Sequence, residues 1–136
     1  MRTVLLDNEA VTALADPTHH KHRVVLAHLS GVVARRQKGA AARVVVATAV
    51  RVEAGWDRSA PGAAAINRYR VGDAPLDGTT ANLAAGIVNR TGVSVADAHT
   101  GAVVRSLTGD DIVVLTSDPQ DMVRVSTPQP VTAIRI

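Results

Sequence analysis

The sequence predicts an α/β sandwich around a central, mostly parallel β-sheet. Three short apolar runs, 4–6, 44–47 and 112–115, are rich in Val, Ile and Leu and do not alternate with polar residues. Such runs are typical of parallel strands that are buried on both faces. Helical patterns lie between them, so strand and helix alternate along the chain, an order that places helices against a parallel sheet.

Four helices are predicted from apolar residues at helical spacing and from the residues that follow them. Their ranges are 20–37, 48–58, 79–89 and 94–107. A glycine follows three of these ranges within three residues, and Ser59-Ala60-Pro61-Gly62 follows the remaining one. The tail, 131–136, alternates apolar and polar residues, which predicts a last strand nearer the sheet edge.

Length and composition predict one domain over residues 1–136, because 136 residues with 46% apolar content can fill one core. The absence of cysteine excludes disulfides and thiolate metal sites and fits a reducing compartment. The first residues carry charge too early for a signal peptide, and no apolar run approaches the roughly 18 residues of a membrane span. We therefore expect a cytoplasmic protein that is not embedded in a membrane.

Several common enzyme classes are excluded by missing motifs. The chain has no Gly-x-x-x-x-Gly-Lys-Ser/Thr phosphate loop, no Gly-x-Gly-x-x-Gly after a strand and no Gly-x-Ser-x-Gly nucleophile elbow. The net charge is +3, and 13 of the 15 basic residues are arginine, the better side chain for binding phosphate. This balance is compatible with nucleic acid as a partner without requiring it.

Four acidic residues occupy informative places. Asp7 directly follows the first apolar run, and Asp118 follows the third. In open α/β sheets, ligands gather outside the carboxyl ends of the strands. Glu53 lies in the helix after the second run, and Asp97 lies in the first turn of the helix that opens at Ser94. We expect these acids, from four distant segments, to converge on one pocket.

Each acid also has a purely structural interpretation. Asp7 and Asp118 are typical helix N-caps, the latter followed by proline in the first helical position. Ser94 and Asp97 have the spacing of a capping box. Glu53 is compatible with a solvated helix face. Capping does not explain, however, why Glu53 has apolar sequence neighbours, or why three caps share one edge of the sheet.

Four segments resemble the acidic motifs of PIN domains, in an order and spacing similar to those of small bacterial toxins of the VapC type. These segments are Val4–Asp7, Thr48–Gly55, Ala96–His99 and Val113–Pro119. The resemblance runs essentially end to end, and Leu-Thr-Ser-Asp-Pro is its most specific part. It implies a three-layer α/β/α sandwich. It also implies the four catalytic and metal-binding carboxylates Asp7, Glu53, Asp97 and Asp118.

The resemblance further implies an endoribonuclease that depends on Mg²⁺ (or Mn²⁺) and leaves a 5′-phosphate and a 3′-hydroxyl. Clustered carboxylates repel one another, and such a cation offsets the repulsion. It can also orient a water molecule, lower its pKa and stabilise charge on a phosphodiester. The family analogy adds a role as the toxin of a toxin–antitoxin pair, with RNA as substrate, a cognate antitoxin as partner and a homodimer as the assembly.

Further residues are candidates for holding the substrate. Thr116 and Ser117 are expected to hydrogen-bond a metal-bound water or a phosphate, and Arg35 and Arg36 to bind the RNA backbone. Whether Glu9, Asp121 or His99 joins the site stays open.

A second class of function is a non-enzymatic domain with an acidic pocket, either an inactive PIN-like fold or a receiver-like phosphoacceptor. A receiver requires a lysine near the site after the last strand, whereas both lysines here precede residue 39.

Overall fold

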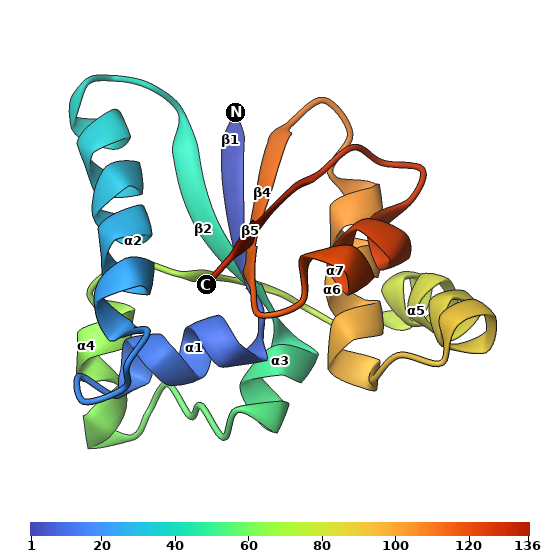
Figure 1. The fold of residues 1–136 in the computed structure, drawn as a ribbon, viewed down its shortest axis with the longest axis horizontal. Helices are drawn as coiled ribbons and strands as arrows, with labels where there is room; N and C mark the ends of the chain where they lie inside the picture. The colour runs from blue at the N-terminus through green and yellow to red at the C-terminus, as the bar shows by residue number, and fades with distance from the viewer.

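The computed structural model describes residues 1–136 and contains one sheet of five strands (Figure 1). The strands are β1 (Arg2–Leu6), β2 (Ala42–Ala47), β3 (Gly72–Ala74), β4 (Asp111–Thr116) and β5 (Thr132–Arg135). Their order is β3-β2-β1-β4-β5, and every neighbouring pair is parallel. The predicted parallel sheet is therefore confirmed, and so is the position of the C-terminal strand at its edge.

Helices cover both faces of this sheet. They are α1 (Asn8–Ala15), α2 (His22–Gln37), α3 (Thr48–Glu53), the 3₁₀ turn η1 (Pro61–Ala63), α4 (Ala64–Asn67), α5 (Gly78–Thr91), α6 (Val95–Ser106) and α7 (Pro119–Ser126). Helices α1, α2 and α4 lie on one side, and α6 and α7 lie on the other, with α5 outside α6 (Figure 1). This arrangement is the three-layer α/β/α sandwich that the sequence predicted. No helix is both long and apolar enough to cross a lipid bilayer.

The core is packed from small branched side chains, because the chain has no phenylalanine. Leu5 and Leu6 of the central strand β1 are fully buried, as are Val46 of β2 and Leu115 of β4. Adjacent residues in a strand point to opposite faces, so consecutive apolar residues fill both layers between sheet and helices. This burial explains why the strands appear in the sequence as unbroken apolar runs.

One predicted helix is shorter than expected. The pattern predicted a helix over 48–58, but α3 ends at Glu53. Gly55 adopts a positive φ of 66°, which turns the chain out of the helix, and the N–H of Trp56 donates to the carbonyl of Arg51 (2.8 Å). Strand β3 was not predicted, because its three residues, Gly-Asp-Ala, carry no apolar pattern.

The topology brings distant segments together at the carboxyl edge of the sheet, that is, the side on which the parallel strands end. Since all strands are parallel and β1 lies between β2 and β4, the carboxyl ends of these three strands are neighbours. Helices α1, α3 and α7 begin directly after them, and α6 packs against α3 and α7. The chain segments that follow β1, β2 and β4 therefore meet at one place.

Candidate active site

Asp7 lies at the centre of this edge and is held by both carboxylate oxygens. Its Oδ1 accepts from the backbone N–H of Ala10 (2.8 Å), which makes Asp7 the N-cap of α1. Its Oδ2 accepts from the backbone N–H of Ser117 (3.1 Å), which follows β4. Burial raises the pKa of Asp7, although these hydrogen bonds and that of Thr116 oppose the rise. Asp7 is thus a helix cap and a buried, fixed carboxylate at once.

Asp97 is the acid around which the others gather. It lies half-buried in the first turn of α6, where its backbone N–H donates to the N-cap oxygen of Ser94 (3.1 Å). Burial raises the pKa of Asp97, and the negative charges of Asp7, Glu53 and Asp121 raise it further. Acids from four segments of the chain therefore lie in the same region as Asp97.

Glu53 reaches this group from the last residue of α3, which packs against α6. Its apolar sequence neighbours do not bury it: Glu53 is exposed, and Val52 is 82% exposed. Glu53 is therefore the most accessible of the gathered acids, whereas Asp7 is buried.

The structure places Asp121, rather than Asp118, among the acids that raise the pKa of Asp97. Asp118 is exposed and caps α7, because its Oδ1 accepts from the backbone N–H of Asp121 (3.1 Å). Asp121 also pairs with Arg124 (2.9 Å), on the same helix. The capping interpretation therefore describes the contacts of Asp118, and its role as a metal ligand stays a prediction, while Asp121 is a further acid near Asp97.

Thr116 and Ser117 support the Asp7 carboxylate from the end of β4, and a contact between them and a substrate stays a prediction. The Thr116 hydroxyl is fully buried, accepts from the backbone N–H of Asp118 (2.9 Å) and hydrogen-bonds Asp7. Ser117 contributes its backbone N–H to Asp7. Both residues therefore fix the position of the Asp7 carboxylate, a role that their location at the end of β4 explains.

Arg35 and Arg36 lie at the opposite edge of the sheet. They belong to the last turn of α2, which ends just before β2 begins, and Arg36 donates to the carbonyl of Ala42 (2.7 Å) at the start of that strand (Figure 1). A strand of six residues is roughly 20 Å long. These arginines therefore lie about one strand length from the gathered acids, and their contact with an RNA backbone stays a prediction.

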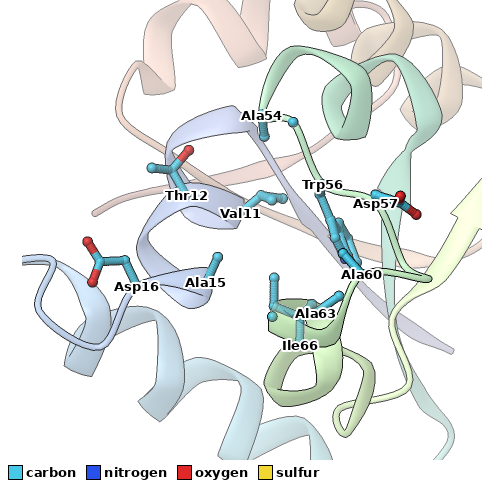
Figure 2. A pocket seen from close by; sticks show the side chains of 12 residues that line it. Val11, Thr12, Ala15, Asp16, Ala54, Trp56, Asp57, Ala60, Ala63 and Ile66 are labelled. Atoms are coloured by element: carbon cyan, nitrogen blue, oxygen red, sulfur yellow. The ribbon is translucent and has the colours of Figure 1, made fainter.

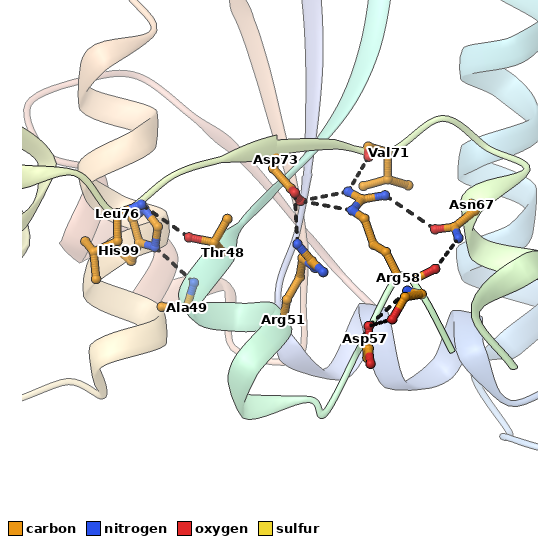
Figure 3. A network of polar contacts seen from close by, with 11 residues as sticks. Thr48, Ala49, Arg51, Asp57, Arg58, Asn67, Val71, Asp73, Leu76 and His99 are labelled. Atoms are coloured by element: carbon orange, nitrogen blue, oxygen red, sulfur yellow. Dashed lines mark hydrogen bonds and ion pairs between the residues drawn. The ribbon is translucent and has the colours of Figure 1, made fainter. Parts of the chain in front are cut away.

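His99 and Glu9, whose roles the sequence left open, have structural contacts. His99 is fully buried, and its Nδ1 accepts from the backbone N–H of Ala49 (3.2 Å), which joins α6 to α3 (Figure 3). Burial lowers its pKa, consistent with a neutral ring. Glu9 lies 3.4 Å from both His19 and Lys21 and raises the pKa of Asp7 by its charge.

A polar cluster that the sequence did not reveal fixes the segment after α3. Arg51 and Arg58 both pair with Asp73 of β3, at 2.9 and 2.7 Å (Figure 3). The same two guanidinium groups lie 5.3 and 4.5 Å from the ring centroid of Trp56. This cluster fixes the chain immediately beyond Glu53, and no local pattern in the sequence predicts it.

An apolar cavity of about 330 Å³ lies between α1 and the segment that contains η1 and α4 (Figure 2). Val11, Ala15, Trp56, Ala63 and Ile66 supply much of its apolar lining. None of the gathered acids lines it, so we do not assign the chemistry of the protein to this cavity.

The gathered acids offer only oxygen ligands, the type that Mg²⁺ and Mn²⁺ prefer. No three Asp, Glu, His or Cys side chains are close enough to enclose a metal ion. Mg²⁺, however, is usually bound through one or two carboxylates and keeps several waters. Burial is the main cause of the raised pKa values of Asp7 and Asp97, and nearby negative charge adds to both; a bound cation would offset these effects, so the residues present fit such an ion.

No protein-family model and no curated protein matches the sequence. Solved structures do match the fold. The structure of VapBC2 from Rickettsia felis bound to promoter DNA contains a chain that matches with a TM-score of 0.57 at 9% identity, over 98% of both chains. FitAcB from Neisseria gonorrhoeae matches with a TM-score of 0.55 at 15% identity, over 97% of this chain and 96% of that one.

FitAB bound to an IR36 DNA fragment matches with a TM-score of 0.57 at 15% identity, over 97% of this chain and 94% of that one. This chain has the fold of these proteins. The match confirms the PIN-like architecture that the motifs predicted from the sequence.

Proposed function

We propose that this protein is a divalent-metal-dependent endoribonuclease and the toxin of a type II toxin–antitoxin pair. One observation carries the proposal: the parallel topology brings the segments of Asp7, Glu53, Asp97 and Asp121 to the carboxyl edge of a PIN-like sheet, where burial and the other three charges raise the pKa of Asp97. Unneutralised carboxylates that are gathered in this way are costly unless a cation offsets them. The cost indicates a functional role rather than a structural one.

Asp7 and Asp97 are the residues that we expect to bind Mg²⁺ or Mn²⁺ directly. When bound, the ion would lower the pKa of a water molecule and stabilise charge on the phosphodiester. The backbone N–H groups of Ala10 and Ser117 hold Asp7 in one orientation, which fixes the place of the ligand oxygens. We expect Glu53, which is exposed, to accept a hydrogen bond from the attacking water, with Asp121 as a further acceptor. The expected products carry a 5′-phosphate and a 3′-hydroxyl.

RNA cleavage by the purified protein tests this proposal. We expect cleavage of cellular RNA with Mg²⁺ or Mn²⁺ and none with EDTA. Asp97→Asn is expected to lower the rate at least a hundredfold, because it removes a charge from the metal site without changing its shape. Asp118→Asn is the matched control, since it removes an acid from the same edge but affects only a helix cap. Asp121→Asn is expected to lower the rate more than Asp118→Asn.

Two outcomes would contradict the proposal. Equal cleavage by the wild type and Asp97→Asn would show that the activity comes from a contaminant or from another site. Metal binding without cleavage across a broad panel of RNA would favour the alternative of an inactive PIN-like domain with an acidic pocket.

We further propose a cognate antitoxin as partner, a homodimer as the assembly and the cytoplasm as the location. The matched structures include VapBC2 and FitAB, whose names each join two components, and they support a protein partner. Large apolar side chains at the surface, among them Val52 and Val95 at 82% and 62% exposure, provide area for protein contacts. Co-expression with the product of the neighbouring gene should relieve growth arrest and yield a complex.

Light scattering on the isolated chain should give twice the monomer mass, and a monomer mass would refute the dimer.

A further inference from the structure

Arg135 belongs to a row of residues that crosses the end of the sheet. Strand β5 pairs with β4 so that Arg135 lies beside Thr116. Asp7 lies on the other side of Thr116, because Leu6 pairs with Leu115 and the N–H of Asp7 donates to the Leu115 carbonyl (3.1 Å). Neighbouring strands are about 4.8 Å apart, so the backbones of Asp7 and Arg135 are separated by roughly 10 Å.

The guanidinium of Arg135 is fastened close to the acids. Its Nη1 donates to the backbone carbonyl of Ser117 (3.1 Å). The backbone N–H of the same Ser117 donates to Oδ2 of Asp7 (3.1 Å). One residue therefore links the catalytic carboxylate and the arginine, and it fixes the direction in which this long, exposed side chain extends from the edge strand.

The charge of Arg135 is not neutralised by a carboxylate. No Asp or Glu lies within ion-pair distance of it, whereas Arg124 pairs with Asp121 at 2.9 Å and Lys21 lies 3.4 Å from Glu9. Guanidinium has five N–H donors, and the Ser117 carbonyl is the one acceptor that Arg135 contacts in the protein. The guanidinium of Arg135 is held in place, carries an unneutralised positive charge and lies beside the acids. It can therefore bind an anionic ligand that approaches those acids.

We propose that Arg135 binds a phosphate of the RNA backbone next to the bond that is cleaved, an inference that rests on the proposed function. Its planar fork matches phosphate oxygens, and its position two strands from Asp7 places positive charge where the gathered acids would repel RNA. Contacts to phosphate set the position of the strand without reading its sequence. Arg135 is therefore a positioning residue beside the gathered acids, whereas Arg35 and Arg36 lie at the opposite edge of the sheet.

Arg135→Gln tests the proposal, because glutamine keeps a donor for the Ser117 carbonyl but removes the charge. Arg35→Gln is the matched control: Arg35 is also an exposed arginine without a carboxylate partner, but it lies at the opposite edge. RNA affinity is measured by fluorescence anisotropy in EDTA at several salt concentrations, and KM and kcat are measured with Mn²⁺.

We expect Arg135→Gln to weaken binding and raise KM about tenfold, the loss of one charge-assisted hydrogen bond. The kcat of Arg135→Gln should stay within about twofold of the wild-type value. The slope of log affinity against log salt concentration should become less negative by about 0.7. Arg35→Gln should match the wild type. Arg135→Lys, which keeps the charge without the fork, should recover part of the affinity.

The outcomes separate this inference from the proposed function. If the wild type cleaves RNA and Arg135→Gln behaves like Arg35→Gln, the role of Arg135 is refuted and the nuclease stands. If the wild type binds RNA through Arg135 without cleaving it, the phosphate contact of Arg135 stands, whereas the nuclease and the place of Arg135 beside a cleaved bond are refuted. If the wild type neither binds nor cleaves RNA, both are refuted.

Discussion

Replacing Gly101 with alanine is expected to force α6 away from α7. Gly101 lies one turn beyond Asp97 on α6 and faces α7, the helix that carries Asp121. A Cβ atom at this position would lie 2.6 Å from the backbone oxygen of Val125 and 2.7 Å from its Cβ. Neither atom belongs to a flexible side-chain end, so the helices themselves must shift.

The size of the effect follows from two opposing terms. Overpacking of this kind costs roughly 3 kcal/mol, and alanine in place of glycine inside a helix returns about 1 kcal/mol. The free energy of unfolding should therefore fall by about 2 kcal/mol. For a chain of 136 residues this corresponds to a fall in Tm of about 7 °C.

Gly86→Ala on α5 is the matched control, because a Cβ atom there meets no atom within 4 Å. It should raise the free energy of unfolding by up to about 1 kcal/mol. Thermal unfolding followed by circular dichroism measures both variants, and Gly101→Ala should also cleave RNA more slowly, since Asp97 and Asp121 move apart. A Gly101→Ala protein as stable as the wild type would refute the packing described for α6 and α7.

Three further predictions concern charge. The folded protein raises the pKa of Asp97, so the contribution of Asp97 to stability should fall as pH rises from the ordinary carboxyl pKa through the folded-state value. Asp97→Asn should therefore melt higher than the wild type at pH 7, and this advantage should shrink in acid. Mn²⁺ at about a hundred times its Kd should stabilise the wild type by about 2.7 kcal/mol and Asp97→Asn by much less, as measured by thermal shift; an equal response would place the ion elsewhere. Asp73→Asn should lower the free energy of unfolding by about 1 kcal/mol, a small loss because both ion pairs of Asp73 are partly exposed. It should also red-shift the fluorescence of Trp56, the one tryptophan, and an unchanged spectrum would contradict the described cluster.

The parallel sheet was predictable because its strands leave an unambiguous signal. Buried parallel strands need apolar residues on both faces, and 4–6, 44–47 and 112–115 have them. Strand β3 is too short for such a signal. It is stabilised by its pairing with β2 and by the ion pairs of Asp73 with Arg51 and Arg58. Both of those contacts are long-range, so no local pattern contains them.

The site was predictable to the level of its segments but less so to the level of each acid. Asp7 and Asp97 were predicted as site acids, and the structure gathers other acids around Asp97. Asp118 and Asp121 both lie near the start of α7, and only the direction of the helix determines which carboxylate faces α6 and which caps the turn. The aspartate three residues after the cap was the available signal, because it lies one helical turn further on.

The arginine nearest the acids was not predicted from the sequence. Arg35 and Arg36 form a pair in the sequence, but the length of α2 carries them to the edge of the sheet opposite the acids. Arg135 is isolated in the sequence and becomes notable only through the pairing of β5 with β4. Strand order, rather than charge clustering, decides which arginine lies near the acids.

Anomalous diffraction from crystals soaked in Mn²⁺ tests the central claim most directly, because it locates the ion without relying on activity. We predict one strong peak at the carboxyl edge of the sheet, with a carboxylate oxygen of Asp7 or Asp97 about 2.2 Å away. The peak should disappear in crystals of Asp97→Asn and persist in those of Asp118→Asn. A peak bound to Asp118 alone, or no peak at this edge while Mn²⁺ binds elsewhere, would contradict the assignment of the active site.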